Sequence, residues 1–532
     1  METIIHFCKY PNSRLMKNIR FLIIILAILK FLIPYVLQNG AYQPHHDEYL
    51  YLDQSNHLDW SYYENPPLIS GLAFITKAMG NNIVWIKFWP SLFGALTFYI
   101  TCEIAVAFGG WSFSVFLVFM AFVVTSILRI HYILSPVFLD LFFSSAMVLT
   151  LLRYIQTERS YWLYLFALSA GLGILSRYSL GFYLIALLVG VLLSPKAKVY
   201  INYHFYLALL LCAAIISPLY FWQSKHGFPI THLLQEMQDN YSQNLSAGDF
   251  FNNQFLMLLP IFYLWIMGIL YVVLTKKGLT RYLFILNAYI LSLIFLINIH
   301  AKGTYALNAY PGLIALGAYN FDRISRKYMK FIRYGLITFS ALFGLYVAGL
   351  AVPFLPPDAL SDLYQTKHFT ATGILKWDDQ QNHALPQDFA DMLGWKEITD
   401  RTLRIYSTLT EEDKAHTLIL TDEYGVAGGL NYFGKKSGLP FAYCESGSYN
   451  QWIPEQMDVK VIIWLSRESK KSDDEVFKHF KLGDQMDDIS INYSRISNLK
   501  LTLYTVPDGQ QNEALHQSII ARKQALSRKQ FN

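Results

Sequence analysis

Between residues 45 and 68 the chain gathers the acidic, imidazole and aromatic side chains best suited to chemistry. The run begins His45-His46-Asp47-Glu48-Tyr49 and ends His57-Leu58-Asp59-Trp60-Ser61-Tyr62-Tyr63-Glu64-Asn65-Pro66-Pro67-Leu68. A carboxylate can act as a general base or bind a cation, and an imidazole can transfer protons or bind a metal. The run directly follows the first hydrophobic stretch, so a membrane span there would place these groups at the membrane surface. Their position points to catalysis or to ion handling.

The adjacent acids Asp47 and Glu48 have two interpretations. Both could be solvated surface charges. However, Tyr42, Tyr49 and Leu50 flank them, so we expect at least one carboxylate to be partly removed from water. A carboxylate in that setting can act as a base or coordinate a cation. We therefore favour a functional role for this pair.

A further acid, Asp140, lies in the apolar sequence Leu134-Ser-Pro-Val-Phe-Leu-Asp140-Leu-Phe-Phe. A carboxylate within an apolar helix is costly, and it is usually functional or paired with a cation. We expect Asp140 to support the site, with Arg129 or Arg177 as its structural partner.

The segment Glu64-Asn65-Pro66-Pro67 ends the acidic loop. Its prolines fix the backbone at the start of the following helix, and that structural role could be their only one. Glu64 and His226 together could instead ligate a divalent metal ion.

The composition of the chain indicates the class of protein whose helices must position these groups. The chain has 532 residues, of which 54% are hydrophobic and 15% charged, whereas soluble domains average roughly 25% charged residues. This is typical of a polytopic membrane protein. The basic N-terminus precedes an apolar run of full spanning length without a cleavage site, which we interpret as a retained first helix. Eleven stretches reach or approach spanning length: 19–37, 83–106, 111–128, 136–154, 161–175, 177–193, 203–222, 251–274, 280–299, 304–320 and 333–355.

The distribution of Lys and Arg predicts the orientation. With the N-terminus in the cytoplasm, sixteen basic residues fall in inside segments and five in outside segments, as the positive-inside rule requires. The acidic loop 38–82 and everything after residue 356 would then be extracytoplasmic, in a cell membrane protein of the inner or plasma membrane. We predict two domains: residues 1–355 in the membrane, including that loop, and a soluble domain over 356–532.

The five outside cations also need an explanation. They are Lys77, Arg129, Arg177, Lys225 and Lys302. Each could simply extend its charged end to the membrane interface. Their gathering on one side, opposite an acidic loop, favours a site for an anion such as a phosphate. The net charge of +5 is small, and the positive balance is confined to local segments of the chain. Nucleic acid is therefore not an expected partner.

Two segments are predicted to form amphipathic helices on the outer surface, 66–80 and roughly 229–250. In the C-terminal part, strands are predicted over 417–421, 459–465 and 499–506, and helices over 425–432 and 475–480. This order predicts a small α/β domain. Gly425, Gly428 and Gly429 lack dinucleotide-loop spacing, so we expect them to serve a tight turn and close packing. The four cysteines lack metal-site spacing and indicate neither a disulfide framework nor a zinc finger.

The acidic loop is one of a series of motifs along the chain. The others are Ser135-Pro136 with Asp140, Gly171-Leu-Gly-Ile-Leu-Ser-Arg177-Tyr178, Ser217-Pro218-Leu-Tyr-Phe-Trp222-Gln-Ser-Lys225-His226-Gly227, Lys302-Gly-Thr-Tyr305 with Tyr310-Pro311, Tyr424-Gly425-Val-Ala-Gly428-Gly429-Leu430 and Ser446-Gly447-Ser-Tyr449-Asn-Gln-Trp452. In this order the series resembles bacterial family 39/83 glycosyltransferases, relatives of protein O-mannosyltransferases and of the lipid A aminoarabinose transferase. The resemblance implies a GT-C fold and inverting transfer of a sugar from a polyprenyl-phosphate donor.

The resemblance also implies roles for single residues. Asp47 would be the catalytic carboxylate, Glu48 would support it, and Asp140 would be a second acid near the site. Arg177 stands where relatives often carry lysine, and with Lys302 it would hold the lipid phosphate.

We further predict substrate contacts at Tyr178, Tyr305 and Tyr63. Glu64 matches an acid that contacts a metal in the Glu-Lys-Pro-Pro motif of the aminoarabinose transferase. Asn65 replaces the basic residue of that motif. We also predict that Asn65 contacts the substrate.

We therefore expect an integral membrane glycosyltransferase whose acceptor is a lipid, a glycan or a protein. Its donor is a lipid-linked sugar and its cofactor, if any, a divalent metal. The alternatives are a transporter or lipid flippase, with carboxylates that bind protons or cations, and a non-enzymatic assembly or receptor subunit.

Overall fold

The structure, a computed structural model, describes residues 13–231, 235, 247–301, 303–328, 330–366, 369–467, 481–505 and 509–528. The chain divides into two compact units. The first contains Met1–Leu37, Lys87–Tyr220 and Leu234–Val352, and the second Gln38–Ile86, Phe221–Leu233 and Pro353–Asn532. The acidic loop 38–82 therefore belongs to the same unit as the C-terminal part of the chain.

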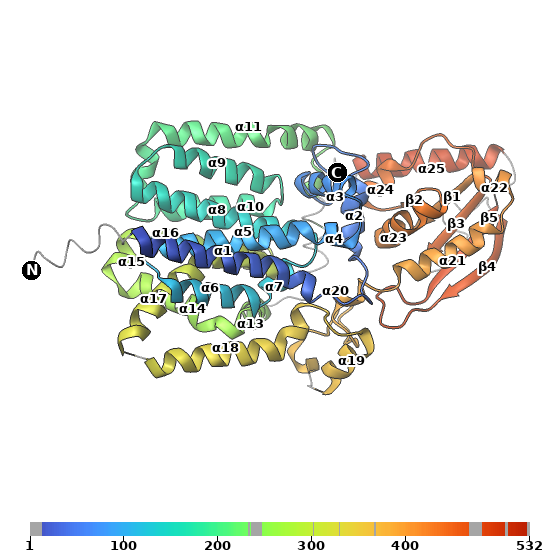
Figure 1. The fold of residues 1–532 in the computed structure, drawn as a ribbon. Coiled ribbons are helices and arrows are strands. Elements are labelled where there is room, and N and C mark those ends of the chain that lie inside the picture. Colours follow the sequence, from blue (N-terminus) through green and yellow to red (C-terminus); the bar gives the residue numbers. More distant parts are fainter. Residues whose placement is uncertain are drawn as a thin grey trace, which may run out of the picture. The chain divides into compact units, whose positions relative to one another are not determined.

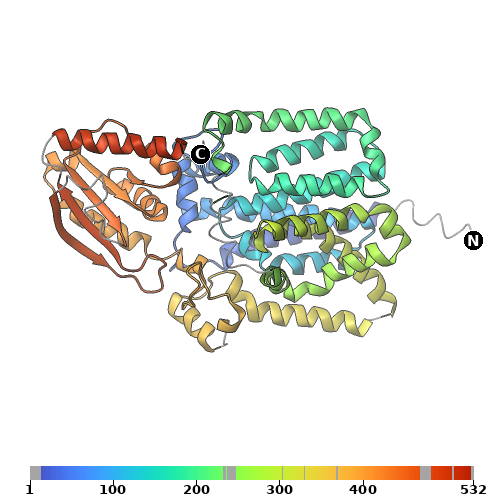
Figure 2. The ribbon, with the colours of Figure 1, turned by 180° about the vertical axis from the view of Figure 1, so that it is seen from behind.

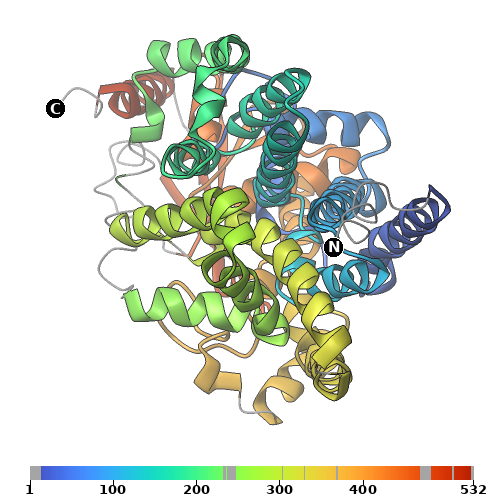
Figure 3. The ribbon, with the colours of Figure 1, turned by 90° about the vertical axis from the view of Figure 1, so that its left-hand side faces the viewer.

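The first unit is a bundle of helices that run alongside one another (Figures 1 and 2). Its helices are α1 (Ser13–Val36), α5 (Phe88–Phe108), α6 (Ser112–Val123), α7 (Ile127–Ile130), α8 (Pro136–Thr157), α9 (Tyr161–Ile174), α10 (Ser179–Leu192), α11 (Tyr203–Lys225), α13 (Ala247–Met257), α14 (Phe262–Leu274), α15 (Lys276–Arg281), α16 (Leu283–Asn298), α17 (Tyr310–Tyr328) and α18 (Lys330–Ala351). Figure 3 views several of them nearly along their axes. In this unit α5 packs against α1, α8 and α17.

Each of the eleven predicted spanning stretches contains a helix, but their lengths differ. Within the described chain, Met16–Val36, Ile83–Phe108, Pro136–Thr157 and Tyr203–Lys225 are long and apolar enough to cross a membrane. The stretch 251–274 is a helix pair bent by 67°, and could serve as a fifth span. The stretch 304–320 starts as a 3-10 helix, Gly303–Ala309, before α17. The protein is thus a multi-pass membrane protein, and the count of eleven spans stays a prediction.

Local sequence sets the helix ends that matter most for the predicted site. Helix α8 begins at Pro136, a residue well suited to the first helical position, after the extended backbone of Ser135. Asp140 therefore lies in the first turns of α8. The chain leaves helical geometry between α9 and α10, and Arg177 lies in this break.

The second unit combines the acidic loop with a five-stranded sheet. Its helices are α2 (His46–Gln54), α3 (Leu68–Ala78), α4 (Ile83–Ile86), α19 (Pro357–Thr366), α20 (Gln387–Ala390), α21 (Trp395–Ser407), α22 (Glu411–Ala415), α23 (Tyr424–Gly434), α24 (Gly447–Trp452) and α25 (Gly509–Arg528). Its strands are β1 (Thr417–Thr421), β2 (Ala442–Cys444), β3 (Val461–Ser466), β4 (Lys481–Ile489) and β5 (Leu499–Thr505).

The sheet has the strand order β2-β1-β3-β5-β4. Strands β2, β1 and β3 are parallel, whereas β5 runs antiparallel to both β3 and β4. On one face, Leu418, Ile462 and Trp464 form a buried core with Leu515 and Ile519 of α25. Figures 1 and 2 show α25 lying along the sheet.

The sequence predictions for this unit are largely confirmed. The three predicted strands correspond to β1, β3 and β5, the helix over 425–432 to α23, and the helix over 66–80 to α3. The location of α3 on the outer surface stays a prediction. The predicted helix over 475–480 and most of the one over 229–250 lie outside the described residues. The class is mainly helical with a small α/β part, as predicted.

Glycines of α23 allow α2 to approach closely. A Cβ added to Gly425 would lie 2.9 Å from Cβ of His46, and one added to Gly428 would lie 2.5 Å from Cβ of Tyr49. Both distances are shorter than a normal contact between carbon atoms. Close packing of these glycines is therefore confirmed, and it fixes the N-terminus of α2 against α23. The tight turn predicted for them is wrong, because Gly425, Gly428 and Gly429 all lie within the helix α23.

Candidate active site

The N-terminus of α2 carries the predicted catalytic pair. His45 caps the helix, since its Nδ1 accepts the backbone N–H of Asp47 at 3.2 Å. In return the fully buried Glu48 carboxylate accepts the backbone N–H of His45 at 2.8 Å. The two contacts form a capping box. Glu48 therefore supports Asp47 by fixing the start of the helix.

Asp47 combines fixed partners with access to solvent. Its Oδ1 accepts a hydrogen bond from the hydroxyl of Tyr424 at 2.7 Å and lies 3.1 Å from Nε2 of His46. About one third of its side chain remains exposed (33%). A carboxylate in the first turn is also favoured by the helix dipole. Asp47 is thus oriented from two sides and still open to a substrate.

His46 lies between two carboxylates. Its Nδ1 is 3.4 Å from Oδ1 of Asp391, while its Nε2 faces Asp47. Asp391 is buried, and Arg495 donates to the same Oδ1 at 3.4 Å. In the arrangement Asp47–His46–Asp391–Arg495, carboxylates alternate with basic side chains, and each group orients the next.

The pKa values of this cluster follow from burial and charge. Burial favours the neutral acid, but the imidazoles of His46 and His45 and the Tyr424 hydroxyl outweigh it and hold the pKa of Asp47 well below its usual value. Burial lowers the pKa of His46, but Asp47 and Asp391 outweigh it and raise that pKa overall. Burial raises the pKa of Asp391 to about 6, against the opposing effect of His46 and Arg495. Asp47 is therefore ionised at neutral pH.

Glu64 and Asn65 have structural partners in the same unit. Glu64 caps α24, because its two carboxylate oxygens accept the backbone N–H of Ser448 at 2.7 Å and the Ser448 hydroxyl at 2.6 Å. Burial raises the pKa of Glu64, although these donors oppose it. Asn65 is buried and its amide pairs with Gln54 in both directions, at 2.9 and 3.1 Å. Both residues therefore hold the loop to its surroundings.

The metal prediction rests on Glu64 and His226, and both side chains have other contacts. Besides its donors from Ser448, Glu64 accepts from Gln54 at 3.2 Å. His226 stacks on Trp222, and its Nδ1 lies 2.8 Å from the Trp222 carbonyl oxygen. No contact joins Glu64 to His226 among the described residues, so this ligand pair stays a prediction.

The part of the chain that the structure describes holds one other group with metal-ligand spacing. It comprises His45, His46 and Asp47, whose ligand atoms lie within 4.8 Å of one another. However, Nδ1 of His45 caps α2 and the two nitrogens of His46 face carboxylates. The second ring nitrogen of His45, Nε2, lies 3.8 Å from Oδ2 of Asp391. A metal at this group stays a prediction.

In the first unit the structure pairs Asp140 with Arg177. One oxygen of the buried Asp140 lies 3.3 Å from both the Arg177 guanidinium and the Ser179 hydroxyl, and the other lies 3.4 Å from the Asn308 amide. The guanidinium also lies over the ring of Tyr305, 4.0 Å from its centroid. Of the two predicted partners of Asp140, Arg177 is the one observed, and the contacts hold its cation in place.

The remaining predicted contacts are distributed over several elements. Arg129 lies in α7 and Tyr178 precedes α10, both in the first unit. Lys225 is an exposed residue at the end of α11 and belongs to the second unit. In the second unit, the Tyr63 hydroxyl accepts a hydrogen bond from the amide of Gln451 at 3.2 Å. Lys302 lies outside the described residues.

Sequence reasoning did not assign roles to five residues of the cluster around Asp47. His45 and His46 were visible beside the acids. Tyr424 lies three residues after the end of a predicted strand, where side chains at a sheet edge often act. Asp391 and Arg495 carry no such signal. They reach His46 only because the fold brings the turn after α20 and the loop before β5 to one place.

Comparisons with known proteins indicate the same class of enzyme as the sequence motifs do. A family described as dolichyl-phosphate-mannose-protein mannosyltransferase matches residues 64–222. No curated protein matches the chain. The structure of ArnT from Cupriavidus metallidurans bound to undecaprenyl phosphate has a TM-score of 0.60 and 13% identity, over 91% of this chain and 97% of that one. Its apo form gives a TM-score of 0.58 and 13% identity, with the same coverage.

A larger protein shares the fold as well. The arabinofuranosyltransferase AftD from mycobacteria matches with a TM-score of 0.50 and 11% identity, over 92% of this chain and 42% of that one. At such identities the likeness shows the fold, and the family match adds the class of enzyme. Together they identify the chain as a membrane glycosyltransferase of the GT-C fold, similar to families 39 and 83.

Proposed function

We propose that the protein transfers a sugar from a polyprenyl-phosphate donor to a hydroxyl-bearing acceptor at the outer face of the cell membrane. The observation that carries the proposal is Asp47, an ionised and partly exposed carboxylate that His46 and Tyr424 orient. The solved relative ArnT was bound to undecaprenyl phosphate, which supports a donor of this class. The N-terminus is cytoplasmic in this proposal, and the second unit is extracytoplasmic.

In the proposed step, the acceptor oxygen attacks the anomeric carbon of the donor. The bond from that carbon to the phosphate oxygen breaks, polyprenyl phosphate leaves with the electron pair, and the configuration at the carbon inverts. The acceptor proton passes to Asp47. A weak base suffices here, because the attacking oxygen becomes strongly acidic as its new bond to carbon forms.

The leaving phosphate needs a cation that is already in place. We assign this role to Arg177, with Lys302 as the second predicted cation. The guanidinium of Arg177 contacts Asp140 and lies over Tyr305, so it would meet the phosphate with little loss of conformational freedom.

The test is transfer of labelled sugar from synthetic polyprenyl-phosphate sugars, with membrane extract as the source of acceptor. Asp47→Asn should lower the rate about 10²–10⁴-fold, as expected for loss of a base. Asp400→Asn is the matched control, since Asp400 is an exposed acid of α21. Normal transfer by Asp47→Asn would refute the role of Asp47. Ion-coupled solute flux without any donor consumption would instead favour a transporter.

A further inference from the structure

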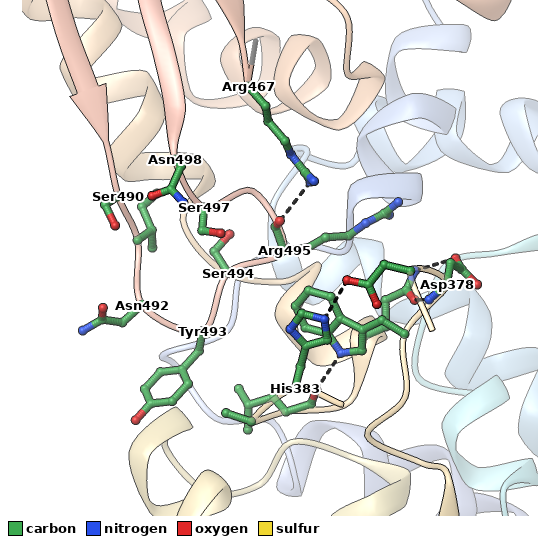
Figure 4. Close-up of a pocket in the computed structure, with 16 residues that line it drawn as sticks. Asp378, His383, Arg467, Ser490, Asn492, Tyr493, Ser494, Arg495, Ser497 and Asn498 are labelled. Atoms are coloured by element: carbon green, nitrogen blue, oxygen red, sulfur yellow. Dashed lines mark hydrogen bonds and ion pairs between the residues drawn. The ribbon is translucent and has the colours of Figure 1, made fainter. Parts of the chain in front are cut away.

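The second unit contains a cavity of about 550 Å³ outside the cluster around Asp47. Its walls come from residues 377–387, from Arg467 at the end of β3, and from the loop 490–498 before β5. Figure 4 shows side chains from these segments facing one another across the space. The volume is in the range of small-molecule sites, and no role has so far been assigned to it.

The lining is polar and carries balanced charge. The lining has two cationic side chains, Arg467 and Arg495, and two anionic ones, Asp378 and Asp379. The cavity therefore has no excess of positive charge to select an anion. Most other polar groups are uncharged hydroxyls and amides: Gln387, Ser490, Asn492, Tyr493, Ser497 and Asn498. Groups that both donate and accept suit a ligand covered with hydroxyls.

A flat aromatic plate forms part of the same wall. The rings of Trp377 and His383 are stacked, with centroids 3.6 Å apart and planes 14° apart. Both rings are held in place, since the Trp377 indole donates to the Leu385 carbonyl at 2.8 Å and His383 contacts Asp379 at 2.8 Å. A fixed aromatic surface can pack against the apolar C–H face of a sugar ring, and little freedom is lost on binding.

The backbone around the cavity is strained. Tyr493 (φ 62°) and Asn498 (φ 64°) line it in the left-handed region, and Gln380 (φ 66°) lies in the first lining segment. These are three of the seven non-glycine residues with positive φ in the described chain. Such conformations cost free energy and gather at functional sites.

One cavity residue also belongs to the cluster around Asp47. Arg495 lines the cavity, and its guanidinium contacts Asp391 and lies 3.3 Å from Nδ1 of His46. We propose that this cavity binds a neutral saccharide and that this saccharide is part of the acceptor; the acceptor role rests on the proposed function. The enzyme would then glycosylate a glycan or glycolipid whose sugar is read by the C-terminal part of the chain.

The test is direct binding to the full-length protein in lipid nanodiscs. A maltoside detergent is avoided, because its headgroup is itself a disaccharide. Maltose, cellobiose, lactose and diacetylchitobiose are the neutral probes, and a glucuronic-acid disaccharide is the acidic one. Ligand-observed NMR should detect at least one neutral probe at about millimolar affinity.

Two variants test the location of the site. Trp377→Ala should weaken binding at least about tenfold by removing the aromatic plate. Asn498→Gly removes an amide where glycine suits the backbone, so the fold is kept while binding weakens severalfold. Trp60→Ala is the matched control, because this indole is 56% exposed and lies outside the cavity. It should bind like the wild type.

The inference is overturned if no neutral probe binds, if only the acidic probe binds, or if both cavity variants bind like the wild type. The assay contains no donor, so it is independent of the chemistry. Asp47→Asn should keep saccharide binding while it loses transfer. If Asp47→Asn transfers normally but Trp377→Ala loses binding, the proposed role of Asp47 fails and the saccharide site stands.

Discussion

The close packing of α2 on α23 gives the sharpest prediction about the candidate site. In Gly428→Ala the new Cβ would lie 2.5 Å from Cβ of Tyr49 and 3.0 Å from the Tyr449 hydroxyl. Carbon atoms in contact are normally about 3.5–4.0 Å apart. Helix α2 must therefore retreat by about 1 Å, and Asp47 at its N-terminus moves with it.

Two effects of this displacement can be measured. Overpacking of this kind costs about 1–3 kcal/mol of stability, so the apparent melting temperature should fall. A 1 Å displacement of a catalytic group can cost about 100-fold in rate, so the initial rate of transfer at saturating donor should fall by about that factor. Binding of the donor should change much less.

The matched control is Gly71→Ala in α3. Nothing lies within 4 Å of the Cβ added there, so alanine should leave transfer unchanged and gain up to about 1 kcal/mol of helix stability. Gly429→Ala is the intermediate case, with 3.3 Å to Cβ of Trp395. If Gly428→Ala transfers and melts like Gly71→Ala, the packing argument for the position of Asp47 is wrong.

Three further predictions concern the carboxyl groups of Asp47, Asp53 and Asp140. Tyr424→Phe removes the hydroxyl donated to Asp47 at 2.7 Å. A hydrogen bond to a charged group contributes about 1.5–3 kcal/mol, and its loss raises the pKa of Asp47. As the pH is lowered, the variant should therefore lose activity at a higher pH than the wild type, which a pH–rate profile measures. Burial raises the pKa of Asp53 to about 7, so the folded state holds a proton that the unfolded state has lost, and stability should fall as pH rises from about 4 to 7. Asp53→Asn keeps one oxygen that can accept from both Tyr449 and Asn431, and it should flatten this decline in melting temperature; an unchanged decline would contradict the assignment. Asp140→Asn leaves the Arg177 guanidinium without its carboxylate and should cost about 3–5 kcal/mol, whereas Asp140→Asn with Arg177→Gln should recover part of the lost stability; a double variant no more stable than the single would argue against the pair.

The features that sequence predicted well have strong local signals. Apolar runs located the helices of the first unit, and continuous β-branched and aliphatic residues located β1 and β3. Asp140 was expected to pair with Arg129 or Arg177, because a carboxylate in an apolar helix needs a partner, and Arg177 provides it. Glu48 was expected to support Asp47 in catalysis, and this role stays a prediction; in the structure its carboxylate accepts the backbone N–H of His45 in the helix cap.

Other features depend on contacts that no local pattern records. Strand β4 is an edge strand with a polar sequence and two irregularities in its pairing with β5, so its alternation is broken. Asp391 and Arg495 contact His46 only through the folded arrangement of distant loops. Asn65 was assigned to substrate binding from a motif, whereas its amide is paired with the buried Gln54.

The central claim is a single displacement at the anomeric carbon with Asp47 as the base. It is tested most directly by NMR of a polyprenyl-phosphate sugar labelled with ¹³C at that carbon. With wild-type protein and acceptor, we predict that the sugar-phosphate signal is replaced by a glycoside of inverted configuration, and that Asp47→Asn leaves the donor intact. Retention of configuration, or inverted product formed by Asp47→Asn at the wild-type rate, would contradict the account.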